Sequence, residues 1–328
     1  MPRPRVFLTR VIDQDALDVI GGETEMDVWP DEFPPSADAL REKMGEADGL
    51  VTTVMDRVDS ALLDSAPGLK VVSQMAVGVD NVDVPELTRR RIPLGYTPDV
   101  LSGATADLSF ALLLAAARRV VETDRWVRAG NWKLAFHPTY WLGADVGGAT
   151  LGIVGLGKIG LEVARRARGF GMELLYYSRT RRGAEEAELG MEYTDLPSLL
   201  RRSDFVSLHV PLTPETRHLI GERELALMKT TAILVSTARG PVVDSGALYT
   251  ALKEGQIGGA GLDVTDPEPI PADDPLLTLD NLVVTPHIGS ASVGSRKAMA
   301  LLAARNVLAG LKGERLVQCY NPEVYGGG

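Results

Sequence analysis

Short apolar runs alternate with amphipathic stretches along the first hundred residues. The runs expected to form strands lie at residues 6–9, 25–29, 49–54, 70–74 and 92–96. The stretches expected to form helices lie at residues 13–20, 36–46 and 59–66. Ser36 is placed to cap the second helix. Strands that alternate with helices predict a parallel sheet, because parallel neighbours need a crossover between them.

A longer helical pattern, rich in alanine and leucine, follows at residues 101–128. An aromatic loop at 132–141 separates it from a second region of alternating strands and helices, residues 150–286. A final helix is expected at 291–311. The pattern therefore predicts an α/β protein with two βα-rich regions, because helices must cover both faces of a parallel sheet.

Composition limits the partners and the location. Hydrophobic residues make up 45% of the chain, and the formal net charge of −10 argues against nucleic acid as a partner. The single cysteine, Cys319, and the lack of an apolar signal segment predict a cytoplasmic location. The longest apolar run, 110–117, is too short to cross a bilayer, so no membrane partner is expected. The terminal glycines 326–328 are expected to be disordered, because nothing there offsets the entropy of ordering.

Three glycines stand between an apolar strand and a helix. Gly155, Gly157 and Gly160 follow the run 151–154, which is the context that a dinucleotide-binding turn requires. Gly155 permits the tight turn, Gly157 lets the backbone approach a pyrophosphate, and Gly160 lets the helix pack close to the strand. The helix N-terminus then offers its N–H groups to the phosphates.

The segment after the second strand of this region indicates the cofactor. An NAD enzyme usually has an acidic residue there for the ribose 2′-hydroxyl. This chain has Ser178, Arg179 and Thr180, followed by Arg181 and Arg182. A guanidinium binds a 2′-phosphate that a carboxylate would repel, so NADP(H) is the predicted cofactor. NAD(H) is the alternative if the basic loop is merely exposed and tolerates either dinucleotide.

Three strand ends of the second region carry Arg239, Glu268 and His287. Ligands bind beyond the carboxyl ends of parallel strands, so these side chains are expected at one edge, beside the glycine loop. Arg239 would hold a carboxylate and polarise a carbonyl, and His287 would protonate the carbonyl oxygen. Glu268 would orient the imidazole. This set predicts reduction of a small 2-oxo acid by hydride transfer.

The other histidines, His137, His209 and His218, have no such setting in the sequence, although His137 lies in the aromatic loop. We assign no metal site.

Taken in order, these segments resemble the D-isomer-specific 2-hydroxyacid dehydrogenase family, and within it the glyoxylate/hydroxypyruvate reductases. The resemblance covers nearly the whole chain. The segments that carry it are residues 75–80, 95–101, 155–160, 237–240, 261–269, 275–277 and 286–290.

The resemblance implies that Arg239, Glu268 and His287 are catalytic, and that the backbone N–H groups of Val77 and Gly78 take the substrate carboxylate. Asp263 would contact the nicotinamide amide. The cofactor-binding residues that it implies are Gly155, Gly157, Lys158, Ile159, Gly160, Ser178, Arg179, Thr180, Thr237, Ala238, Arg239, Asp263, His287 and Gly289.

The family fold consists of two Rossmann-like, doubly wound parallel-sheet domains. The flavodoxin-like substrate domain would be discontinuous, residues 1–98 plus 291–328, and residues 99–290 would bind the dinucleotide. Residues 101–146 would form a homodimer, and Trp141 would reach the substrate pocket of the partner subunit.

The predicted function is NADPH-preferring reduction of glyoxylate, hydroxypyruvate or both to the D-2-hydroxy acid. Two alternatives stay open. One is a non-catalytic NAD(P)H-sensing binding protein on the same fold. The other is a sister dehydrogenase for phosphoglycerate, formate or phosphite. No regulatory domain is expected after about residue 320, which disfavours many phosphoglycerate enzymes, and the loop 75–78 lacks a lysine for an inorganic anion.

Overall fold

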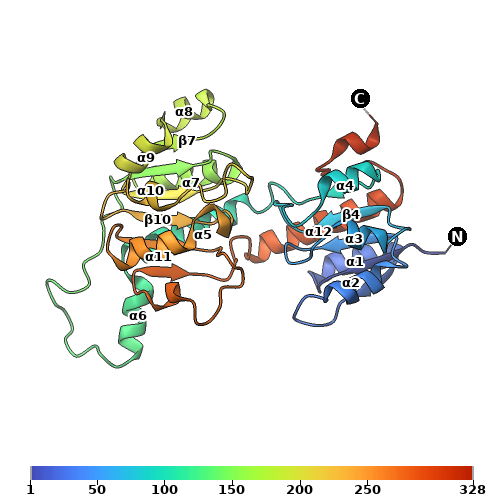
Figure 1. Cartoon of the computed structure of the whole chain (residues 1–328), viewed down its shortest axis with the longest axis horizontal. Coiled ribbons are helices and arrows are strands. Elements are labelled where there is room, and N and C mark those ends of the chain that lie inside the picture. Colours follow the sequence, from blue (N-terminus) through green and yellow to red (C-terminus); the bar gives the residue numbers. More distant parts are fainter. Residues whose placement is uncertain (1, 327–328) are drawn as a thin grey trace. The chain divides into compact units, whose positions relative to one another are not determined.

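The computed structural model describes residues 2–326, so the expectation for Gly327 and Gly328 lies outside the described residues. The chain divides into two compact units (Figure 1). Unit 1 comprises Met1–Leu101 and Ala291–Gly328, and unit 2 comprises Ser102–Ser290. Each unit contains one parallel sheet with helices on both faces, which confirms the predicted fold class.

The sheet of unit 1 has the order β2-β1-β3-β4-β5, and every pairing in it is parallel. This is the flavodoxin-like order, in which the direction of winding reverses between β1 and β3. The strands are β1 (Arg5–Leu8), β2 (Glu25–Val28), β3 (Gly49–Thr52), β4 (Val71–Gln74) and β5 (Leu94–Gly95). The helices are α1 (Gln14–Glu23), α2 (Ala37–Met44), α3 (Ser60–Asp64), α4 (Val84–Arg89), α12 (Val293–Leu311) and the 3-10 helix η3 (Pro322–Tyr325). Ser36 accepts the N–H of Ala39 at 3.2 Å, so the predicted cap is confirmed.

Alternate residues of β1 enter different layers, as the two-residue period of a strand requires. Val6 and Leu8 pack with α1 and α12, whereas Phe7 packs with α2, α3 and α4. The final helix is therefore part of the core that the first hundred residues begin. Ser73 of β4 also donates a hydrogen bond of 2.9 Å to the carbonyl of Ala303 in α12.

The sheet of unit 2 has the order β12-β11-β10-β9-β6-β7-β8, again with parallel pairings throughout. This is the Rossmann order extended by one strand, and it reverses between β6 and β9. The strands are β6 (Thr150–Val154), β7 (Glu173–Tyr177), β8 (Met191–Tyr193), β9 (Phe205–Leu208), β10 (Ile233–Ser236), β11 (Gly259–Leu262) and β12 (Leu282–Val284). The helices are α5 (Ser102–Ala117), α6 (Val120–Arg128), α7 (Lys158–Gly169), α8 (Gly183–Leu189), α9 (Leu196–Arg202), α10 (Glu222–Leu225), α11 (Ser245–Lys253) and the 3-10 helices η1 (Gly240–Val242) and η2 (Pro275–Thr278).

The prediction of one helix over 101–128 is wrong, because the structure has two helices there. α5 ends at Ala117, and Arg119 has a left-handed backbone with φ of 55°. The carbonyl of Ala117 accepts the N–H of Ala144 at 2.8 Å, and the Arg119 guanidinium donates two bonds to Glu122. These contacts turn the chain into α6. Neither proline nor glycine lies at the break, so the pattern could not show it.

Residues 101–146, which include α5, were expected to form a homodimer, but part of α5 is covered within unit 2 itself. Phe110, Leu112 and Leu113 are buried in the core of unit 2, against α7 and the sheet, so they need no partner subunit. By contrast, α6 has no buried residue. We call α6 and the loop 129–149 the arm, and Figure 1 shows it extending away from the sheet of unit 2. The exposed apolar side chains of the arm are Val120, Val127, Trp132, Leu134, Phe136, Tyr140 and Leu142.

Across residues 2–326, none of the helices combines the length and the apolar character that crossing a membrane requires.

Candidate active site

The glycine loop lies where the winding of the unit 2 sheet reverses, directly after β6. Gly155 has a φ of 97°, and a Cβ there would lie 2.8 Å from the carbonyl of His209. A Cβ on Gly160 would lie 2.3 Å from the carbonyl oxygen of Gly155, whereas Gly157 faces open space. α7 begins at Lys158, with Gly157 as its cap. Its first N–H groups have no intrahelical acceptor, so the loop fits a dinucleotide pyrophosphate.

The basic segment after β7 contains three arginines in different settings. Arg181 donates two bonds of 2.8 Å to Glu186, and Glu186 also accepts from Tyr176. Arg182 lies 3.9 Å from Glu185. Arg179 is exposed and has no hydrogen bond or ion pair within residues 2–326. Hydrogen bonding and the charge of Arg179 lower the pKa of Glu215, but of the three arginines Arg179 has the guanidinium that can bind a 2′-phosphate without breaking a hydrogen bond or ion pair.

The three predicted catalytic residues follow adjacent strands. Arg239 follows β10, Glu268 follows β11 and His287 follows β12, so all three belong to the carboxyl edge of the unit 2 sheet. The structure brings the Nδ1 atom of His287 to 2.5 Å from Oε1 of Glu268. Both side chains are about one-third exposed, so the pair reaches solvent. Within residues 2–326 no hydrogen bond engages the Nε2 atom of this imidazole, so it can bond a ligand.

The charge state of Glu268 follows from its neighbours. Burial by itself raises the pKa of this carboxyl group. The hydrogen bond and charge of His287, together with the N–H of Thr265 and the charge of Arg239, outweigh burial and lower the pKa below its ordinary value. Glu268 is thus ionised at neutral pH and can stabilise a protonated imidazole.

Asp263 holds the turn that carries His287. Its side chain is 2% exposed, and its Oδ1 accepts from Oγ1 of Thr285 at 2.7 Å and from the N–H of Ile288 at 2.8 Å. Its Oδ2 accepts from the N–H of Gly289 at 2.7 Å. His287 itself has a φ of 52°, a conformation that costs about 1–3 kcal/mol in a residue other than glycine. The buried carboxylate offsets this strain by bonding both sides of the histidine.

His209 also lies at this edge, so the expectation that it has no such setting is wrong. It follows β9 directly and touches the turn at Gly155 through its backbone. Its Nε2 lies 2.8 Å from Oγ of Ser207, and its Nδ1 is buried without a partner in residues 2–326. Burial lowers its pKa to about 3, so the imidazole is neutral. His209 lies beside the glycine loop only because β9 is the neighbour of β6 in the sheet, and a sequence motif does not show that order.

In unit 1, Val77 and Gly78 lie in the loop after β4, where Val77 is exposed and Gly78 is half-buried. Within residues 2–326, no carbonyl or side chain accepts a hydrogen bond from the backbone N–H groups of these two residues. Free N–H groups in consecutive residues form an anion-binding concavity. The loop is therefore suited to a carboxylate.

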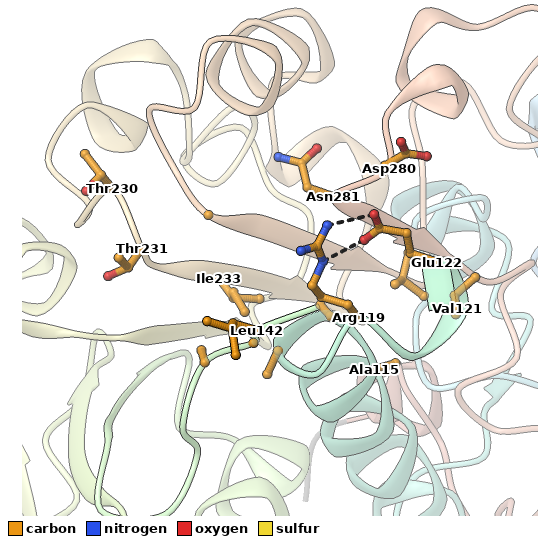
Figure 2. A pocket seen from close by; sticks show the side chains of 16 residues that line it. Ala115, Arg119, Val121, Glu122, Leu142, Thr230, Thr231, Ile233, Asp280 and Asn281 are labelled. Atoms are coloured by element: carbon orange, nitrogen blue, oxygen red, sulfur yellow. Dashed lines mark hydrogen bonds and ion pairs between the residues drawn. The ribbon is translucent and has the colours of Figure 1, made fainter. Parts of the chain in front are cut away.

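Trp141 packs within its own chain. Its ring lies 5.5 Å from that of Trp126 and 4.8 Å from the guanidinium of Arg119, and its Nε1 is buried without a partner in residues 2–326. A hollow of about 520 Å³ lies beside it, at the amino ends of β10 and β12 (Figure 2). Arg119 and Glu122 face each other there, and none of the predicted site residues lines the hollow. It is therefore separate from the candidate active site.

Comparison with known proteins decides the family. The family model described as the NAD binding domain of D-isomer specific 2-hydroxyacid dehydrogenase matches residues 110–289. The chain belongs to the D-isomer specific 2-hydroxyacid dehydrogenase family. This confirms the predicted resemblance. The dehydrogenase is therefore an oxidoreductase that uses a nicotinamide cofactor, and unit 2 contains its dinucleotide-binding domain.

Relatives of this dehydrogenase match it over nearly their whole length. The glyoxylate reductase of Korarchaeum cryptofilum is 56% identical over 322 residues, which cover 98% of this chain and 97% of the relative. The glyoxylate reductase of Thermococcus litoralis is 52% identical over 325 residues, 98% of each protein.

Solved structures agree with this fold. A protein from Thermus thermophilus superposes with a TM-score of 0.91 at 47% identity, covering 96% of this chain and 99% of that one. The NADPH-dependent glyoxylate/hydroxypyruvate reductase of Sinorhizobium meliloti, in complex with NADP and malonate, superposes with a TM-score of 0.85 at 32% identity, covering 98% of each chain.

Proposed function

We propose that this dehydrogenase reduces a small 2-oxo acid, glyoxylate or hydroxypyruvate, to the D-2-hydroxy acid, with NADPH as its preferred cofactor. The observation that carries the proposal is the His287–Glu268 pair at the edge that also holds Arg239 and the glycine loop. Relatives named glyoxylate reductase support the choice of substrate. We further propose that the enzyme acts in the cytoplasm.

In this mechanism the reduced nicotinamide, when bound, supplies the hydride. Arg239 binds the substrate carboxylate and polarises the carbonyl. Protonated His287 donates a proton from Nε2 to the carbonyl oxygen. Glu268 fixes the ring through Nδ1 and stabilises its positive charge. Asp263 keeps the histidine turn in place and has one lone pair left for the nicotinamide amide.

An initial-rate panel tests the function. Glyoxylate, hydroxypyruvate, pyruvate and 3-phosphohydroxypyruvate would each be offered with NADPH and with NADH. We expect the highest kcat/KM for glyoxylate or hydroxypyruvate with NADPH. Turnover of no 2-oxo acid would favour the alternative, a binding protein that senses NAD(P)H, and a preference for the phosphorylated acid would favour a sister dehydrogenase.

The cofactor preference has a direct test at Arg179. Replacing Arg179 with alanine is expected to lower kcat/KM for NADPH by roughly 10- to 100-fold, the value of a hydrogen bond to a charged group. Use of NADH should change little. Arg181→Ala is the matched control, because Arg181 is paired with Glu186. Equal losses with both cofactors, or equal losses in both variants, would remove Arg179 from this role.

We also propose a homodimer built on the arm. The arm exposes seven large apolar side chains and borders the hollow at the carboxyl end of α5. A monomer would leave this apolar surface in water. Light scattering should give twice the chain mass of 35.2 kDa. Phe136→Asp should shift the particle toward the monomer, whereas Phe33→Asp, at an equally exposed phenylalanine of unit 1, should not. A wild-type particle of single-chain mass would reject the dimer.

The Glu268 carboxylate should set the pH range of reduction. The pKa of Glu268 is lowered, so the carboxylate stays charged at neutral pH and places a negative charge beside Nδ1 of His287. Glu268→Gln keeps a hydrogen bond and loses the charge, so the pH above which kcat falls should move down. Asp266→Asn, at a nearby carboxylate that lies 3.8 Å from Arg217 instead, should leave the profile unchanged. If kcat against pH coincided for wild type and Glu268→Gln, the glutamate would have no electrostatic role in proton donation.

A further inference from the structure

A buried side-chain amide is hydrogen-bonded to the loop that follows β4. Gln74, the last residue of β4, is fully buried, and its Nε2 donates to the carbonyl oxygen of Gly78 at 2.9 Å. This bond holds the carbonyl group of Gly78, one of the two residues whose N–H groups have no acceptor within residues 2–326, and so limits rotation of the backbone at that residue. Glycine has the most backbone freedom to lose, so this restraint acts where the loop most needs it.

A second amide ties the loop to a neighbouring strand end. Nε2 of Gln74 also donates to Oδ1 of Asn81 at 2.6 Å. The Nδ2 of Asn81 donates to the carbonyl oxygens of Thr53 and Asp56, at 3.0 and 2.6 Å. The backbone carbonyl of Asn81 accepts the N–H of Val58 at 3.0 Å. The carboxyl end of the loop is therefore bonded to the segment that follows β3.

That segment is itself fixed by a buried carboxylate. Asp56 is 3% exposed, and its Oδ2 accepts from the hydroxyl groups of Thr9 and Thr52 at 2.5 and 2.9 Å and from the N–H of Thr53 at 2.9 Å. Thr9 follows β1 and Thr52 ends β3, so Asp56 occupies the point where the winding of the unit 1 sheet reverses. The network therefore rests on two strand ends.

We propose that Gln74 and Asn81 are positioning residues for the substrate carboxylate: they hold the loop 75–80 so that its N–H groups stay directed at the anion. This inference rests on the proposed function. The side-chain amide of Gln74 is hydrogen-bonded to Gly78 and Asn81. The Nδ2 of Asn81 donates to the carbonyl oxygens of Thr53 and Asp56. These amides therefore act on the substrate only through the loop that they hold. A pre-formed loop binds its anion without first losing conformational entropy.

The test compares two buried neighbours on β4. Gln74→Met keeps the size of the side chain and removes the bonds to Gly78 and Asn81. Ser73→Ala is the matched control, because Ser73 is equally buried but its hydroxyl bonds α12 on the opposite face. Each variant would be measured for KM of glyoxylate, KM of NADPH, kcat, Tm and the Kd of oxalate, a non-reacting dicarboxylate, on the NADPH-loaded enzyme.

For Gln74→Met we expect KM for glyoxylate and Kd for oxalate to rise about tenfold, because a loop that is no longer held would lose about one N–H bond to the carboxylate. KM for NADPH and saturated kcat should stay near the wild-type values, and Ser73→Ala should lower Tm without moving the anion constants. Asn81→Ala should repeat the anion effect if Gln74→Met fails to fold.

Two outcomes would overturn the inference. Equal changes in oxalate affinity for Gln74→Met and Ser73→Ala would show a general loss of stability, and unchanged oxalate affinity in both Gln74→Met and Asn81→Ala would show that the loop needs no such support. A wild type that neither reduces glyoxylate nor binds oxalate would reject the proposed function, and the inference with it.

Discussion

Replacing His287 with alanine is expected to lower kcat for 2-oxo acid reduction by roughly 10²–10⁴-fold, the range that general acid catalysis supplies. The physical reason is the loss of the proton that meets the carbonyl oxygen as hydride arrives. Binding of NADPH should change little, because the imidazole is proposed to face the substrate. The measurements are kcat with saturating substrate and the Kd of NADPH from fluorescence titration.

His218 gives a matched control for this variant. It also has a left-handed backbone, with φ of 51°, and its Nδ1 lies 3.6 Å from a carboxylate, Asp244. His218→Ala should keep wild-type kcat. A loss of less than tenfold in His287→Ala, or the same loss in both variants, would mean that another group donates the proton.

Replacing Asp263 with asparagine should have the second largest effect, a loss in kcat on the order of 10²-fold. The carboxylate accepts from Thr285, Ile288 and Gly289 with both oxygens, and an amide would turn one of those acceptors into a donor. The strained turn at His287 would then shift, and a displacement of about 1 Å at a catalytic group costs that much in rate. The measurement is kcat together with Tm.

Asp204→Asn provides the comparison for Asp263→Asn. Asp204 also accepts a backbone N–H, from Thr150 at 2.9 Å, but it lies at the amino end of the same sheet. It should lower Tm and leave kcat unchanged. If the two variants lost stability equally and kept kcat equally, Asp263 would serve the fold alone.

The sequence was most informative where chemistry and strand ends coincide. Gly155 and Gly160 could be given roles from their spacing alone, and the structure places a backbone atom where a Cβ on either would lie. Arg239, Glu268 and His287 were expected at one edge because each follows a strand of one sheet, and that edge is where they lie. Regular alternation of strand and helix was enough to predict parallel sheets.

Features that depend on partners distant in sequence could not be predicted. The break at Arg119 depends on Ala144 capturing the carbonyl of Ala117, more than twenty residues away. The position of His209 depends on the order of β6 and β9, which the chain order hides. The burial of α5 could not be predicted, because the sequence of an alanine- and leucine-rich helix is the same whether its own core or a partner subunit covers it.

The last helix gives the protein an order of assembly on the ribosome. Unit 2 is a single stretch of chain, 102–290, and is complete before α12 has been synthesised. Unit 1 at that moment lacks α12, so the face of its sheet that carries Val6, Leu8, Val51 and Val71 is covered only by α1. Domains generally fold as units during synthesis, and exposed apolar faces invite aggregation. The dinucleotide-binding domain of the nascent enzyme can therefore fold before the core of unit 1 is complete. In this interval the chain most needs a chaperone.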